Sequence, residues 1–143
     1  MVLGWLRERV RIRTKQKIDG FCQRHAPQAD VEFLRECGIT ENIEAARIAL
    51  GVRRAVAKLG LVEPEFVAKT DDYPGSLEVL PFWDSIDVFA FLLELENELG
   101  VRLSEKDINH IFNFNETRKQ GGSVKDWIDG TIAVLSSRKT SPG

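Results

Sequence analysis

The tetrapeptide Asp84-Ser85-Ile86-Asp87 combines one hydroxyl with two carboxylates at the start of a helix-patterned run, residues 88–99. A helix N-terminus has unpaired backbone N–H groups and the positive end of the helix dipole, so it favours a phosphate on Ser85. Asp84 is placed to cap the helix, and Asp87 adds a second carboxylate in the first turn. The pattern predicts anionic chemistry at Ser85, although an Asp-x-x-Asp spacing also suits a simple helix cap.

The helix after Ser85 is predicted to be apolar on two sides, at about 100° of rotation per residue. The expected core face contains Val88, Phe91, Leu92, Leu95 and Leu99. The second apolar sector contains Ile86, Phe89, Ala90 and Leu93. An acidic stripe beside the core face contains Asp87, Glu94 and Glu98. Because a helix with two apolar sides must bury both, the second sector either reaches into a broad core or contacts a partner or the N-terminal extension.

The elements that position Ser85 are predicted to be helices separated by glycine and proline breaks. They are a basic segment over residues 3–25, a short helix from Asp30 to Cys37 that Gly38 ends, a long helix after Thr40 that Gly60 ends, and helices over residues 85–99, 105–112 and 123–137. Residues 61–81 contain several turn-forming residues and are expected to form a long loop across the bundle.

The composition fits a small binding module better than a self-sufficient enzyme. With 143 residues, of which 43% are hydrophobic, the chain has room for one packed domain and an extension. A formal net charge of −2 gives no global sign of nucleic-acid binding. Residues 1–25 nevertheless carry seven basic and two acidic side chains, so this arm is an alternative binding site for a membrane or a nucleic acid.

The sequence carries no pattern of export or of a metal centre. Its N-terminal apolar run is too short for a signal peptide, and no run approaches the ~20 apolar residues of a membrane span, so we expect a cytoplasmic protein. Cys22 and Cys37 are expected to be free thiols. With His25 and His110 they offer four metal-ligating side chains, but a paired Cys-x-x-Cys is missing. No metal site and no catalytic residue is therefore predicted.

Residues 85–100, with the sequence Ser-Ile-Asp-Val-Phe-Ala-Phe-Leu-Leu-Glu-Leu-Glu-Asn-Glu-Leu-Gly, resemble the second helix of acyl carrier proteins, which begins with Asp-Ser-Leu-Asp. Residues 101–104 resemble the strand-like step that follows that helix. Upstream, residues 52–67 are similar to the end of the family's first helix and the turn that leaves it. Downstream, residues 123–129 resemble the start of its last helix. The resemblance covers about residues 42–136.

The resemblance implies an all-α fold, an acyl-carrier-like four-helix bundle with an extra N-terminal helical segment. We expect the basic helical extension over residues 1–39, the bundle over residues 40–137 and a flexible tail over residues 138–143. The implied function is that of a monomeric carrier without enzymatic activity, in fatty acid or polyketide biosynthesis. Such a carrier holds an acyl or related group as a thioester on 4'-phosphopantetheine, attached covalently to Ser85.

The resemblance also assigns residues to the cofactor and to partner proteins. The implied cofactor-binding residues are Ser85, Asp84, Ile86 and Asp87, and the implied partner-binding residues are Phe89, Leu93, Glu94 and Glu96. Asp84 would help to hold the metal of a phosphopantetheinyl transferase, while Glu94 and Glu96 would meet basic surfaces of that enzyme and of acyl-processing enzymes. No nucleic-acid partner is implied. An unmodified protein-interaction domain that keeps the carrier fold is the alternative function.

Overall fold

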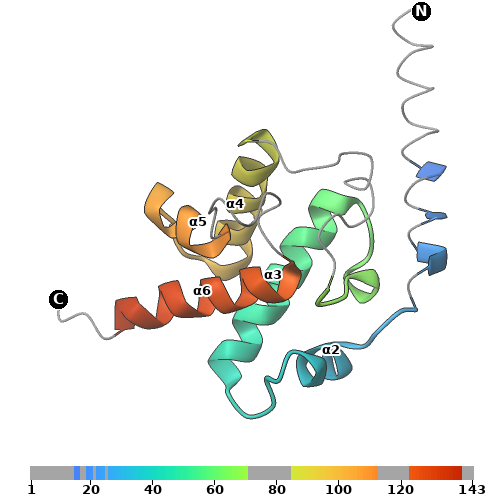
Figure 1. The fold of residues 1–143 in the computed structure, drawn as a ribbon, viewed down its shortest axis with the longest axis horizontal. Helices are drawn as coiled ribbons and strands as arrows, with labels where there is room; N and C mark the ends of the chain where they lie inside the picture. The colour runs from blue at the N-terminus through green and yellow to red at the C-terminus, as the bar shows by residue number, and fades with distance from the viewer. Residues whose placement is uncertain are drawn as a thin grey trace, which may run out of the picture.

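The computed structural model describes residues 15–16, 19–20, 22–24, 26–70, 85–112 and 123–139 (Figure 1). The regular elements are α2 (Asp30–Glu36), α3 (Ile43–Gly60), the 3-10 helix η1 (Pro64–Phe66), α4 (Ser85–Leu99), α5 (Glu105–Phe112) and α6 (Val124–Lys139). The predicted all-α class is confirmed for this part of the chain. Residues 101–104, for which a strand-like step was implied, form no strand. The carrier-like arrangement of the bundle stays a prediction.

The long helix α3 is the centre of the fold, because α2, η1, α4 and α6 all pack against it, while α5 packs against α6 (Figure 1). The Asn42 side chain caps α3 by accepting a hydrogen bond from the Ala45 N–H at 3.0 Å. At the other end, α3 stops at Gly60, as predicted. The left-handed residue that follows is Leu61, with φ of +57°, where glycine is the usual choice.

One apolar cluster joins the helices on both sides of α3. Its largest fully buried apolar side chains are Trp127, Phe33, Phe91, Ile48, Leu95 and Ile128. The core face predicted for α4 is confirmed at Phe91, Leu92, Leu95 and Leu99, while the side chain of Val88 lies outside the described part of the chain. Phe33 and Cys37 belong to the same cluster, so residues before position 39 share one core with the bundle.

The helices α3 and α4 run antiparallel and approach each other closely. Arg47, near the start of α3, donates to the carbonyl oxygen of Leu99 at the end of α4, at 3.3 Å. Lys58, near the end of α3, lies 3.4 Å from the carboxylate of Glu94. Gly51 permits the close approach between these points, because a Cβ there would lie 2.5 Å from Cδ2 of Leu99.

A second close contact joins α5 to α6. A Cβ on Gly130 of α6 would lie 2.8 Å from the Cα of Ile111, so only glycine lets the two backbones meet in this way. Arg138 forms an ion pair with Asp107 of α5. The helix α6 continues to Lys139 and therefore extends two residues into the segment expected to be a tail.

Candidate functional site

The predicted attachment residue, Ser85, is the first residue of α4. Asp84 and the side chains of Ser85, Ile86 and Asp87 lie outside the described part of the chain, so their predicted roles rest on sequence. The backbone position of Ser85 is itself informative, because the first four N–H groups of a helix have no partner within that helix. A phosphate on the residue that begins α4 would lie at the positive end of the helix dipole.

The two following helices show how this chain uses serine to begin a helix. Ser104 precedes α5, and its N–H donates to the Asp107 carboxylate at 2.9 Å while its hydroxyl accepts from the Asp107 N–H at 3.2 Å. Ser123 precedes α6, and its N–H donates to the Asp126 carboxylate at 3.0 Å. Both serines are therefore cap residues. Ser85 differs from them because it is itself the first residue of its helix.

The outer face of α4 carries two large apolar side chains. Phe89 is 59% exposed and Leu93 is 51% exposed. They lie one and two turns beyond Ser85 on the same side of the helix, because positions i, i+4 and i+8 share a face. Exposure of this face agrees with the interpretation that the second apolar sector is separate from the core. The prediction that Phe89 and Leu93 bind a partner stays a prediction.

The acidic side of α4 is engaged by basic side chains of α3. Glu98 accepts a hydrogen bond from Arg54 Nε at 2.9 Å and lies 3.1 Å from Lys58 Nζ. Burial acts to raise the pKa of the Glu98 carboxyl, but the hydrogen bonds from Arg54 and Lys58 outweigh it and hold that pKa below its ordinary value. The same Lys58 ammonium lies 3.4 Å from Oε2 of Glu94. That oxygen is buried and accepts no hydrogen bond from the described part of the chain. These charges therefore already have partners inside the fold.

Glu96, the other predicted partner-binding acid, holds the turn that leaves α4. Its carboxylate accepts a hydrogen bond from the Leu103 backbone N–H at 2.7 Å. Leu103 is buried, so this bond fixes residues 100–104 against the core. Glu96 consequently has a structural role in addition to any contact with a partner, a role that its position on the polar side of the helix did not indicate.

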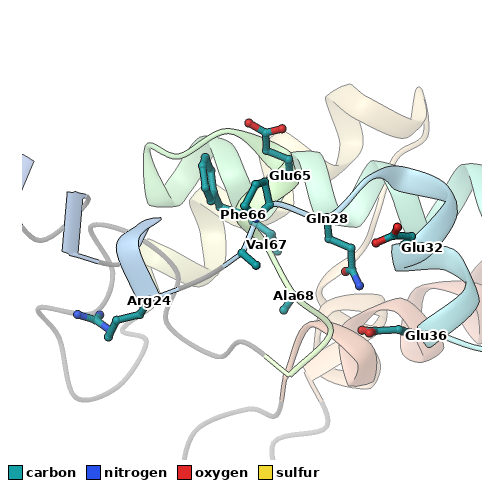
Figure 2. Close-up of a pocket in the computed structure, with 10 residues that line it drawn as sticks. Arg24, Gln28, Glu32, Glu36, Glu65, Phe66, Val67 and Ala68 are labelled. Carbon is teal, nitrogen blue, oxygen red and sulfur yellow. The ribbon is translucent and has the colours of Figure 1, made fainter.

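A cavity of about 340 Å³ lies between α2, η1 and the segment that enters α2 (Figure 2). Sequence reasoning missed this site. Its charged lining residues are Glu32 and Glu36 of α2, Glu65 of η1 and Arg24, and an apolar wall includes Phe66. Glu32 and Glu36 stand one helical turn apart, which was the available sequence signal. The excess of carboxylates favours a cationic group over an anionic one.

Three further features are the state of the cysteines, the grouping of metal-ligating side chains and the length of the apolar helices. Cys22 and Cys37 are free thiols, as predicted, and burial raises the pKa of the Cys37 thiol. Among the described residues, no three His, Cys, Asp or Glu side chains are grouped to hold a metal ion. None of the helices in the described ranges is long and apolar enough to cross a membrane.

Comparisons with known proteins find no matching family model, curated protein or solved structure.

Proposed function

We propose that the chain is an acyl-carrier-like protein that bears 4'-phosphopantetheine on Ser85. The observation that carries the proposal is the position of this serine at the first residue of α4, where the other described α-helices place a different residue type. In α5 and α6 the serine hydroxyl or backbone is used for capping from outside the helix. Ser85 is instead the first residue inside its helix, and the sequence predicts Asp84 for the cap position.

The residues around Ser85 suit a phosphodiester at that position. The unpaired N–H groups and the dipole of α4 would stabilise the phosphate charge, an effect worth about 0.3–1 kcal/mol at an exposed helix end. The group would supply a thiol on which an acyl chain is carried as a thioester. Phe89 and Leu93 continue from Ser85 along one side of α4, and they would give the apolar part of the arm or its cargo a surface to contact.

Partner enzymes would meet mainly apolar area on this helix. Glu94 and Glu98 are neutralised by α3, and Glu96 is bonded to the turn after α4. Exposed ion pairs contribute little to binding free energy, whereas apolar area contributes roughly 25 cal/mol per Å². The proposal therefore assigns recognition chiefly to Phe89 and Leu93, with the acids setting the orientation of a basic partner.

Modification of Ser85 is tested by the intact mass of the full chain after co-expression with a broad-specificity phosphopantetheinyl transferase. The expected result is the added mass of one phosphopantetheinyl group, which Ser85→Ala abolishes. Ser104→Ala is the matched control, because it removes the serine that precedes the next helix and is paired there with Asp107. That variant should still be modified.

A wild-type chain that stays unmodified, under conditions that convert an ordinary carrier, would overturn the proposal. The alternative would then be an unmodified interaction domain, for which the exposed Phe89 and Leu93 are the supporting observation. Modification that persists in Ser85→Ala would place the group on another residue and would likewise contradict the assignment.

A further inference from the structure

Arg53 on α3 is the one charged side chain that the described part of the fold buries, with 1% of its surface exposed. Its Cζ atom lies 4.3 Å from the centroid of the Phe33 ring. Burial lowers the pKa of the guanidinium, and the hydrogen bond to Asp30 opposes that shift. A buried cation is stable only when its N–H groups are bonded and its charge is balanced.

Two separate segments supply the acceptors of this guanidinium. On the α2 side, Nη2 donates to the carbonyl oxygen of Gln28 at 2.8 Å and Nη1 donates to the Asp30 carboxylate at 2.9 Å. On the η1 side, Nε donates to the carbonyl of Val67 at 3.0 Å, and Nη2 also reaches that of Glu65 at 3.1 Å. The segments bond each other as well, because the Gln28 N–H donates to the Glu65 carbonyl at 2.8 Å.

The η1 side of this cluster begins the connection from α3 to α4. Val67 is 1% exposed, so it anchors residues 65–69 in the core. Two residues later, the Lys69 carbonyl accepts from the Lys125 N–H of α6 at 2.9 Å. The Lys69 ammonium donates to the carbonyl of Glu36 at the end of α2, at 3.0 Å. The start of the connection is therefore fastened to α2, α3 and α6 together.

We propose that Arg53 couples the docking of α2 to the position of residues 65–69, so that loosening one segment loosens the other. If α2 leaves its place, the guanidinium loses the only carboxylate that the described residues give it, together with the Gln28 carbonyl. The cation then favours contact with water over its bonds to Glu65 and Val67, which weakens the hold on the connection. Binding of a molecule to α2 would thereby loosen residues 65–69, which lie at the start of the connection that leads to Ser85.

Hydrogen exchange on the full chain, read by mass spectrometry, tests the coupling through Asp30→Asn. Asp30 bonds Arg53 and none of residues 62–70, so the substitution acts first on the guanidinium and leaves the direct bonds from Gln28 to Glu65 and from Lys69 to Glu36 in place. We expect exchange in residues 62–70 to rise by about tenfold, with residues 105–112 unchanged. Glu32→Gln is the matched control, because it removes another carboxylate from the first turn of α2 without touching Arg53, and it should leave residues 62–70 unchanged.

Arg53→Met completes the test because it removes the guanidinium and keeps an unbranched apolar side chain. Both residues 26–36 and residues 62–70 should exchange faster, and adding Asp30→Asn to this variant should not raise exchange in residues 62–70 further. If Arg53→Met does not fold, the Asp30 and Glu32 variants still decide the question. Faster exchange confined to residues 26–36 in Asp30→Asn, or an equal effect of Glu32→Gln on residues 62–70, would overturn the coupling.

Discussion

Two regions of the molecule reverse the usual placement of side chains. One is Arg53 on α3, and the other is the pair Phe89 and Leu93 on α4. The guanidinium is buried and bonded to four oxygen acceptors, whereas the two apolar side chains are more than half exposed. Buried polar groups and adjacent exposed apolar groups are the informative exceptions in a folded protein. The two regions therefore show where this chain departs from what simple burial of apolar surface requires.

The two regions differ in whether other parts of the chain bond or cover the unusual side chains. Every acceptor of Arg53 comes from the chain itself, so the buried charge is explained by the architecture of the fold. Phe89 and Leu93 lie on the opposite side of α4 from the core residues Phe91 and Leu95, and the described helices do not cover them. An internal exception of this kind indicates a structural role, while an uncovered apolar face indicates a surface for another molecule.

The greatest change in the free energy of unfolding should distinguish the core face of α4 from its outer face. Phe91→Ala should lower the free energy of unfolding by about 3–5 kcal/mol, because it removes a buried ring whose centroid lies 5.8 Å from that of Trp127. Phe89→Ala, the matched substitution two residues away, should change it by less than about 0.5 kcal/mol. Urea denaturation of both variants measures the difference. A comparable loss for Phe89→Ala would mean that this side chain is part of the core.

A smaller effect is expected from two neighbouring arginines of α3. Arg53→Met should lower the free energy of unfolding by about 3 kcal/mol, because the carbonyls of Gln28 and Val67 lose their donor at about 1–3 kcal/mol each. Arg54→Met removes a partly exposed ion pair with Glu98 and should lower the free energy of unfolding by less than about 1 kcal/mol. Equal losses for the two variants, measured by thermal and urea denaturation, would contradict the distinction between a buried and a partly exposed arginine.

The smallest effect concerns pH and the acidic side of α4. The pKa of Glu98 is held below its ordinary value in the folded state, so its stabilising contribution is present at neutral pH and is lost as the pH falls through the folded pKa. Glu98→Gln should therefore be less stable than the wild type at pH 7, by under about 1 kcal/mol. This difference should disappear on acidification. A difference that grows as the pH falls would show that the sign is wrong.

The sequence predicted the positions of the helices well because the signals for them are local. The apolar spacing after Ser85 predicted a helix over residues 85–99, and α4 has those bounds. The helix expected over residues 105–112 is likewise α5. Apolar periodicity depends on residues within two turns of each other, so both can be read without knowledge of the fold.

The candidate site was only partly readable from the sequence. The helical wheel identified a second apolar sector with Phe89 and Leu93, but it left open whether that sector reaches into a broad core, and the structure shows both side chains exposed. The ion pairs of Glu94 and Glu98 with α3, and the bond from Leu103 to Glu96, did not follow from the wheel. Those contacts depend on which helix lies beside α4, and that is set by tertiary packing.

Local residue patterns were enough to predict that this chain forms helices, where most of them begin and end, and which face of α4 is apolar beyond the core. The choice between Arg53 and Arg54, which are adjacent and chemically identical, depends on the packing of the folded chain. Arg53 shares a helical face with the buried residues Ala49, Val56 and Ala57, which indicates that it points inward. This spacing does not show which groups accept its hydrogen bonds. The carbonyls of residues 28, 65 and 67 and the carboxylate of residue 30 accept them, from segments far apart along the chain. A buried charge is stable only where such acceptors converge, and convergence is a property of the folded chain.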